Sequence, residues 1–123
     1  MLINLSNHPY DNWDINQKKT AEAMFGSVID LKFPVISPEA CLFDIVELTF
    51  VYARKIDEIL VLNKNGKNAI HLMGEFTFTY NLIELLRAKL IPVFASTSIR
   101  DTIEDEKGAK ISKFRFVRFR AYF

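Results

Sequence analysis

The sequence predicts an α/β domain with a three-layer, mainly parallel β-sheet, helices on both faces and a C-terminal antiparallel β-hairpin. Short apolar segments alternate with segments of helical periodicity in the order β-α-β-α-β-α-β. This alternation favours parallel strands joined by helical crossovers. After residue 98 the chain changes to two strand-like segments around a charged turn, which is typical of a hairpin.

Length and composition indicate one domain and narrow the classes of function. The 123 residues, 50% of them hydrophobic, suffice for one compact core, so a single domain over residues 1–123 is expected. The 16 Lys and Arg residues barely exceed the 15 Asp and Glu residues, which disfavours general binding to duplex nucleic acid. No apolar run approaches the roughly 20 residues of a membrane span, and the first ten residues lack the features of a signal peptide. We expect a cytoplasmic protein without a membrane partner.

Metal and disulfide chemistry are not expected. The single cysteine, Cys41, cannot form an internal disulfide, and the two histidines, His8 and His71, show no metal-ligand spacing. We therefore predict no metal site and no cofactor. Cys41 is interpreted as a packing residue one turn into a helix.

The first 60 residues are expected to hold two strands and two helices. A short strand over Leu2–Leu5 precedes a helix that begins with the capping pair Asp14 and Gln17 and stops at Gly26. A strand of modest length is predicted within Ser27–Phe33. The apolar residues of the first helix that are assigned to its inner face are Ala21, Met24 and Phe25.

The second helix has the clearest periodicity in the chain. Ser37 is predicted to cap it, with Pro38 in its first turn. Residues that recur at three- and four-residue steps define the face expected to pack on the sheet: Leu42, Ile45, Val46, Thr49, Ala53, Ile56 and Leu60.

The second half is expected to add two strands, a helix and the hairpin. A polar turn over Asn63–Asn68 leads into strand Ala69–Met73 and a helix over Phe76–Lys89. That helix is apolar on most sides, which indicates burial between the sheet and another element or a second subunit. A strand over Ile91–Ala95 is expected to end in Ser96, Thr97 and Ser98. The predicted hairpin then comprises Ile99–Ile103, a charged turn that includes Gly108, and Ile111–Tyr122.

The segment KFRFVRFR, residues Lys113–Arg120, alternates cations with aromatic rings. One interpretation is a basic stripe with stacking rings for single-stranded RNA. The other, which we favour, is an edge strand whose rings enter the core while its cations discourage aggregation. The alternation slips at Val117, which indicates a β-bulge.

Polar residues follow three of the predicted parallel strands. Because the carboxyl ends of such strands meet at one edge of the sheet, these residues are expected to converge: Ser6, Asn7 and His8; Gly74, Glu75 and Thr77; Ser96, Thr97, Ser98 and Arg100. Hydroxyls, an imidazole, a guanidinium and backbone N–H groups at a helix start suit a phosphate-bearing ligand. The alternative is that each residue only terminates a strand or caps a turn.

Three members of this set need separate interpretation. A glycine such as Gly74 is also what an ordinary turn from a strand into a helix requires. His8 is the candidate general base because its ordinary pKa lies near neutrality, although a histidine before a proline is often only a surface residue. Glu75 would repel phosphate unless it were protonated, paired with Arg100 or turned toward a ribose hydroxyl, and we favour the ribose contact. His71 lies within an apolar strand and is interpreted as a hydrogen-bonded core residue.

The chain resembles a known protein family in its layout. The opening strand running into LSNHP, a strand followed by GEFT, a strand followed by STS and Arg100, and the closing hairpin are similar to the small single-domain CARF-like proteins of type III CRISPR systems, a compact variant of the CRISPR-associated Rossmann fold. The resemblance implies a Rossmann-like homodimer that binds a cyclic oligoadenylate second messenger across its two-fold axis in antiviral defence. Some members cleave this ligand as metal-independent ring nucleases and others only bind it.

The resemblance also implies site residues and a mechanism. The positions that match the family's ligand-facing strand ends are Ser6, Asn7, Gly74, Glu75, Thr77, Ser96, Thr97 and Arg100. A 2′-hydroxyl of the bound ring would attack the adjacent phosphate, and preorganised donors, Arg100 among them, would stabilise the extra negative charge. His8 as the proton acceptor is our own assignment. A non-catalytic sensor or sponge, or an interaction protein without a nucleotide site, are the alternatives.

Overall fold

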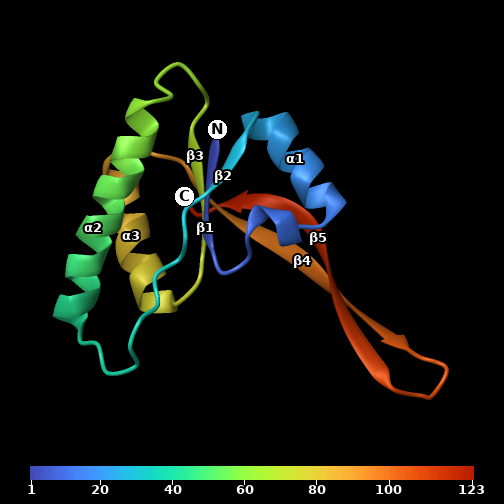
Figure 1. Ribbon diagram of the computed structural model, residues 1–123. Coiled ribbons are helices and arrows are strands. Elements are labelled where there is room, and N and C mark those ends of the chain that lie inside the picture. The colour runs from blue at the N-terminus through green and yellow to red at the C-terminus, as the bar shows by residue number, and fades with distance from the viewer.

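The computed structural model describes all 123 residues as one five-stranded sheet with helices on both faces (Figure 1). The elements in chain order are β1 (Leu2–Ser6), a 3₁₀ turn (Tyr10–Asn12), α1 (Ile15–Phe25), β2 (Val28–Asp30), α2 (Leu42–Val61), β3 (Ala69–Met73), α3 (Phe76–Ala88), β4 (Val93–Glu104) and β5 (Lys110–Ala121). The predicted fold class, a Rossmann-like three-layer arrangement with a C-terminal hairpin, is confirmed.

The strand order is β2-β1-β3-β4-β5, in which the first four strands are parallel and β5 is antiparallel to β4. From β1 the chain passes through α1 to β2, which lies next to β1 on one side. From β3 the chain passes through α3 to β4, which lies in the opposite direction along the sheet. The order therefore reverses between β1 and β3, and in α/β sheets ligands bind in the crevice at such a switch point.

The two faces of the sheet carry separate hydrophobic clusters. α2 and α3 lie side by side over one face (Figure 1) and bury side chains such as Ile56, Phe78 and Leu82 against Ile3 and Leu5 of β1. On the other face, α1 packs with β5 over Leu2 and Ala69. Because β1 is covered on both faces, all five of its residues are buried, as expected for a central parallel strand.

The first helix begins where the sequence predicted, but α2 does not. The Asp14 carboxylate accepts from Gln17 N, and Gly26 adopts a φ of 85° at the end of α1. The Ser37 hydroxyl instead closes a turn by accepting from Glu39 N, and α2 begins only at Leu42 with Cys41 as its N-cap. Cys41 is exposed and bonds to the Asp44 carboxylate, so its interpretation as a packing residue was wrong.

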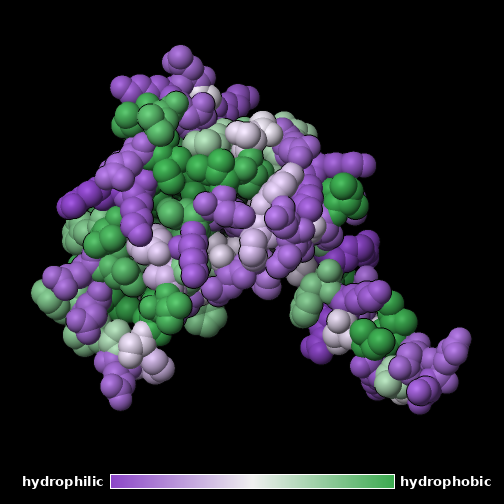
Figure 2. Space-filling view, viewed as in Figure 1, coloured by the Kyte–Doolittle hydropathy of each residue, from purple (hydrophilic) through white to green (hydrophobic).

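Several residues assigned to inner helix faces are exposed instead. Met24 at the end of α1 and Leu42 at the start of α2 both face outward. Only one face of α3 is buried, and its buried residues are Phe78, Thr79, Leu82 and Leu86. Phe76 and Tyr80 lie on the surface. α3 packs on β3 and β4 and beside α2, which is the additional element that was expected; contact of α3 with a second subunit stays a prediction. Figure 2 shows apolar side chains gathered on the part of the surface over α2 and α3.

The hairpin is longer than predicted. The strand expected to end at Ser96–Ser98 runs without interruption to Glu104 and pairs with β5 along its length. The outer part of this ribbon projects away from the body (Figures 1 and 2). Thr97 pairs with Arg118 and Ser98 with Phe116, which leaves Val117 as the extra residue and confirms the predicted bulge. Phe116 and Phe119 are buried while the neighbouring cations are exposed, as the edge-strand interpretation requires; Phe114 is the exception and is exposed.

Helix length and hydropathy do not indicate a membrane span, since no helix of the structure is long and apolar enough to cross a bilayer.

Candidate functional site

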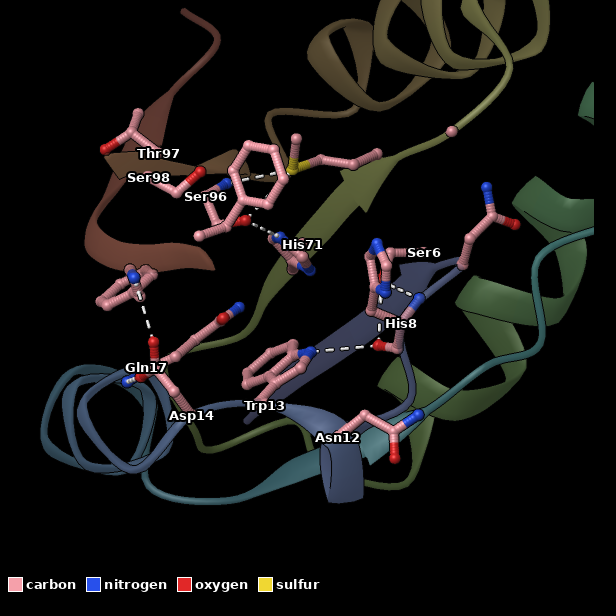
Figure 3. A pocket seen from close by; sticks show the side chains of 15 residues that line it. Ser6, His8, Asn12, Trp13, Asp14, Gln17, His71, Ser96, Thr97 and Ser98 are labelled. Carbon is pink, nitrogen blue, oxygen red and sulfur yellow. Dashed lines mark hydrogen bonds between the residues drawn. The ribbon is translucent and has the colours of Figure 1, made fainter. Parts of the chain in front are cut away.

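A pocket of about 520 Å³ lies at the carboxyl ends of β1 and β3, on the face of the sheet that carries α1. It therefore occupies the switch point of the strand order. Its walls come from the segment after β1, the start of α1, β3, the middle of β4 and β5, and Figure 3 shows their side chains around a common hollow. The lining residues are Ser6, Asn7, His8, Asn12, Trp13, Asp14, Gln17, His71, Met73, Gly74, Ser96, Thr97, Ser98, Phe114 and Phe116.

The expected convergence of strand ends holds for part of the predicted set. Residues from all three segments meet in the pocket: Ser6, Asn7, His8, Gly74, Ser96, Thr97 and Ser98. Ser96 and Thr97 reach it from the middle of a continuous strand and not from a strand end. Three predicted residues, Glu75, Thr77 and Arg100, do not line the pocket.

Glu75, which was assigned to a ribose hydroxyl, is the N-cap of α3 and lies outside the pocket lining. Its carboxylate accepts from Thr77 N at 3.1 Å, from Thr77 Oγ1 at 2.8 Å and from Phe78 N at 2.8 Å. The hydrogen bond from Phe78 N, followed by those from Thr77, lowers the pKa of Glu75. Because this carboxylate already accepts from N–H groups of the first helical turn, those groups are not open to the predicted phosphate, and Thr77 serves the same cap.

Arg100 is held within the hairpin. Its guanidinium donates from Nε and Nη2 to Ser112 Oγ on the opposite strand, at 3.1 and 3.0 Å. No Lys or Arg residue lines the pocket at all. The site therefore offers a ligand no cationic side chain from this protomer.

The segment after β1 is fixed by hydrogen bonds to one carbonyl oxygen. The His8 carbonyl accepts from Asn4 Nδ2 at 2.8 Å, from Trp13 Nε1 at 3.0 Å and from Ser6 Oγ at 3.1 Å. These bonds hold the Trp13 ring against the pocket (Figure 3). The His8 side chain itself makes no hydrogen bond within the protein and is exposed, so it remains free to meet a ligand.

His71 is buried, as the sequence suggested, but it also forms part of the pocket wall. Its Nδ1 lies 2.9 Å from Asn4 Oδ1 and its Nε2 lies 3.1 Å from Ser96 Oγ, and Figure 3 shows the imidazole directed at Ser96. Burial, with a smaller effect of the nearby His8, lowers the pKa of His71 to about 4. The imidazole is therefore neutral at pH 7.

One carboxylate, Asp14, lies in the pocket wall. It accepts from Gln17 N at 2.8 Å and from Phe116 N at 3.0 Å. Burial acts to raise the pKa of Asp14, but the hydrogen bonds from these backbone groups outweigh it and leave the pKa lowered. The carboxylate thus stays ionised and links the start of α1 to β5 at the pocket.

Sequence reasoning missed several pocket residues. Trp13, Asn12 and Gln17 lie near the start of α1, which reaches the pocket only because α1 packs beside β5. Phe114 and Phe116 had been considered as stacking rings of the hairpin but were not placed at the strand ends. The parallel register of β1 and β3 sets Asn4 beside His71. This pairing is the signal from which His71 could have been assigned to the site.

Comparison with known proteins yields one match. A model of the family described as "Uncharacterized protein MJ1673 family" matches residues 1–120. No curated protein and no solved structure matches the chain.

Proposed function

The chain belongs to the MJ1673 family, and we propose that its pocket binds nucleotides of a cyclic oligoadenylate and that the ring is then cleaved. One observation supports this most directly. The switch-point pocket combines aromatic rings with hydrogen-bonding side chains, most of them uncharged, which is the composition by which proteins bind unpaired nucleobases.

Rings and amides have separate roles in this proposal. Phe114 is 69% exposed at the rim of the pocket and offers a face on which a base stacks. Trp13 also lines the pocket but is only 6% exposed, so it contributes an apolar part of the wall. The amides of Asn7, Asn12 and Gln17 supply donors and acceptors for base edges. Because no Lys or Arg contributes, binding depends on stacking and hydrogen bonding more than on attraction of phosphate.

The size of the pocket supports the proposal of a homodimer. A volume of about 520 Å³ is typical of a site for one small molecule, so a ring of several nucleotides would extend beyond one protomer. Phe76, two residues after the pocket residue Gly74, is 88% exposed, and Phe114 is exposed at the pocket itself. Two protomers that meet at this edge would cover both rings and place their pockets on one ligand.

The proposed cleavage uses the ring's own 2′-hydroxyl. The 2′-oxygen forms a bond to the adjacent phosphorus while the imidazole of His8 accepts the proton of the 2′-hydroxyl. The bond from phosphorus to the 5′-oxygen breaks, and that oxygen takes a proton from His8 or water to become the 5′-hydroxyl of the linear product. Arg100 is not assigned a catalytic role here because it lies outside the pocket. Hydroxyl and amide donors alone would stabilise the developing charge, which favours slow turnover and keeps a non-catalytic sensor or sponge as the second candidate.

The test uses cyclic tetra- and hexa-adenylate labelled with ³²P, in buffer with EDTA. Equilibrium dialysis measures retention, and chromatography after incubation detects linear product. We expect retention, and Phe114→Ala to weaken it roughly tenfold or more, because base stacking on an aromatic ring contributes about 1–3 kcal/mol. Phe50→Ala is the matched control, since Phe50 is 57% exposed on α2, on the other face of the sheet.

The outcomes separate the candidate functions. Retention with linear product that His8→Ala slows supports a ring nuclease, whereas retention without product supports a sensor or sponge. No retention of either ring would overturn the proposal and leave an interaction protein without a nucleotide site.

A further inference from the structure

Four side chains from four strands of the sheet form one line of hydrogen bonds that ends in the pocket. Ser96 Oγ lies 3.1 Å from His71 Nε2, His71 Nδ1 lies 2.9 Å from Asn4 Oδ1, and Asn4 Nδ2 donates to Asp30 Oδ1 at 2.7 Å. Ser96 and His71 line the pocket, while Asn4 is buried behind them. The cyclic oligoadenylate proposal uses none of these contacts.

The bonds of Asn4 determine which imidazole nitrogen carries the proton. The amide donates one hydrogen to Asp30 Oδ1 and the other to the His8 carbonyl, so its Oδ1 faces His71 as an acceptor. His71 Nδ1 must therefore be protonated and donate, which leaves a lone pair on Nε2. The Ser96 hydroxyl lies within reach of that lone pair.

A hydroxyl, a base within hydrogen-bond distance and a third group that orients the base are the parts of an activated nucleophile. We propose that Ser96 is a nucleophile activated by His71, and that the pocket acts on a neutral carboxylic ester by acyl transfer to Ser96. The absence of Lys and Arg from the pocket favours a neutral carbonyl over a phosphate, because phosphoryl transfer depends on cationic groups for charge stabilisation. This activity does not depend on nucleotide binding.

The reaction balances with water as the only co-reactant. Ser96 Oγ forms a bond to the ester carbonyl carbon while its proton passes to His71 Nε2. The C–O bond to the alcohol then breaks, and the alcohol oxygen takes the proton from His71. Water attacks the acyl-serine in the same manner, gives its proton to His71, and releases the acid and the Ser96 hydroxyl.

A donor for the developing oxyanion lies next to the nucleophile. Ser96 N donates to Met73 Sδ at 3.3 Å, and a thioether is a weak acceptor. Met73 is partly exposed at the pocket wall and has a flexible side chain. When substrate displaces the thioether, this N–H becomes available to the carbonyl oxygen.

A fluorophosphonate probe tests the proposal, because it is uncharged and phosphonylates activated serines. The full chain is incubated with the probe, and intact-mass spectrometry with peptide mapping identifies the labelled residue. We expect one label per chain on Ser96, none in Ser96→Ala, and labelling at least 100-fold slower in His71→Asn, the size of effect typical for loss of a general base. The hydrolysis of p-nitrophenyl acetate should fall in the same two variants.

Ser27→Ala is the control. Ser27 is exposed and lies outside the pocket, so this variant should label at the wild-type rate. Because His71 is buried, His71→Asn is first checked by circular dichroism; should it fail to fold, the comparison of Ser96→Ala with Ser27→Ala still decides the question.

Absence of label in the wild type, or equal labelling of Ser96→Ala, would overturn the inference. Labelling at Ser96 by a protein that retains no cyclic oligoadenylate would support the serine site and overturn the proposed nucleotide function. Retention of the cyclic oligoadenylate without labelling at Ser96 would support the nucleotide function and overturn the serine site.

Discussion

The ring of Phe33 packs directly on Gly74, so that a Cβ added to Gly74 would lie 2.2 Å from Phe33 Cζ. Phe33 is buried and also meets Phe78 edge to face, with ring centroids 5.3 Å apart. Gly74 does not have a positive φ. The glycine is therefore required by the close approach of an aromatic ring and not by the backbone conformation of the turn.

Gly74→Ala should lower the free energy of unfolding by about 1–3 kcal/mol, the usual cost of overpacking a core. Urea denaturation measures this change. Phe33→Leu in the same chain removes the clashing ring atoms, so the double variant should be less destabilised than the sum of the two single variants. Additive effects would contradict the Phe33–Gly74 contact as the cause.

Removal of the Thr79 hydroxyl should not lower the stability of the protein. Its Oγ1 is buried without a hydrogen-bond partner, so Thr79→Val should leave stability unchanged or raise it by up to about 1 kcal/mol. Thr49→Val is the matched control, because the Thr49 hydroxyl is equally buried but donates to Ile45 O at 2.7 Å. We expect the control to lose stability, and thermal unfolding of both variants makes the comparison.

The stability of the protein should fall in mild acid because of His71. Its pKa is lowered from an ordinary 6.5 to about 4, so between these values the unfolded chain binds more protons than the folded one. The free energy of unfolding is therefore unaffected by His71 above pH 6.5 and decreases by about 3 kcal/mol as the pH falls to 4.

Urea denaturation of the wild type and of His71→Asn at several pH values measures this effect. The carboxylates with lowered pKa, Asp14, Asp44 and Glu75, contribute equally to both proteins. The difference between the two should thus vary between pH 6.5 and 4.5, and His8→Asn should behave as the wild type. Parallel pH profiles for wild type and His71→Asn would show that His71 is protonated in the folded state.

The proposed homodimer should depend on Phe76. The wild type is expected to sediment at about twice the chain mass of 14.3 kDa, and Phe76→Glu should shift it to the monomer by placing a charge in the proposed contact. Leu62→Glu is the control, because Leu62 is 87% exposed at the far end of α2. Analytical ultracentrifugation that finds a wild-type monomer, or a dimer that Phe76→Glu leaves intact, would rule out this edge as the interface.

The sequence by itself determined the elements whose signals are local. The alternation of apolar and periodic segments predicted the parallel order, the Asp14–Gln17 pair and Gly26 marked the ends of α1, and the slip at Val117 predicted the bulge. Each of these depends on residues within a few positions of one another, because caps, turns and strand alternation are formed by neighbours in the chain. The same local reasoning failed at Ser37, where a turn formed in place of a helix cap.

Only the tertiary structure decided which polar side chains share the pocket. Glu75 caps its own helix, and Arg100 is hydrogen-bonded across the hairpin. His71 is 67 residues from Asn4 and 25 from Ser96 in the sequence, and the register of β1, β3 and β4 brings the three side chains together. A one-residue shift of that register would turn each of these side chains to the opposite face of the sheet. The fold class was therefore accessible from the sequence, whereas the chemistry of the site was not.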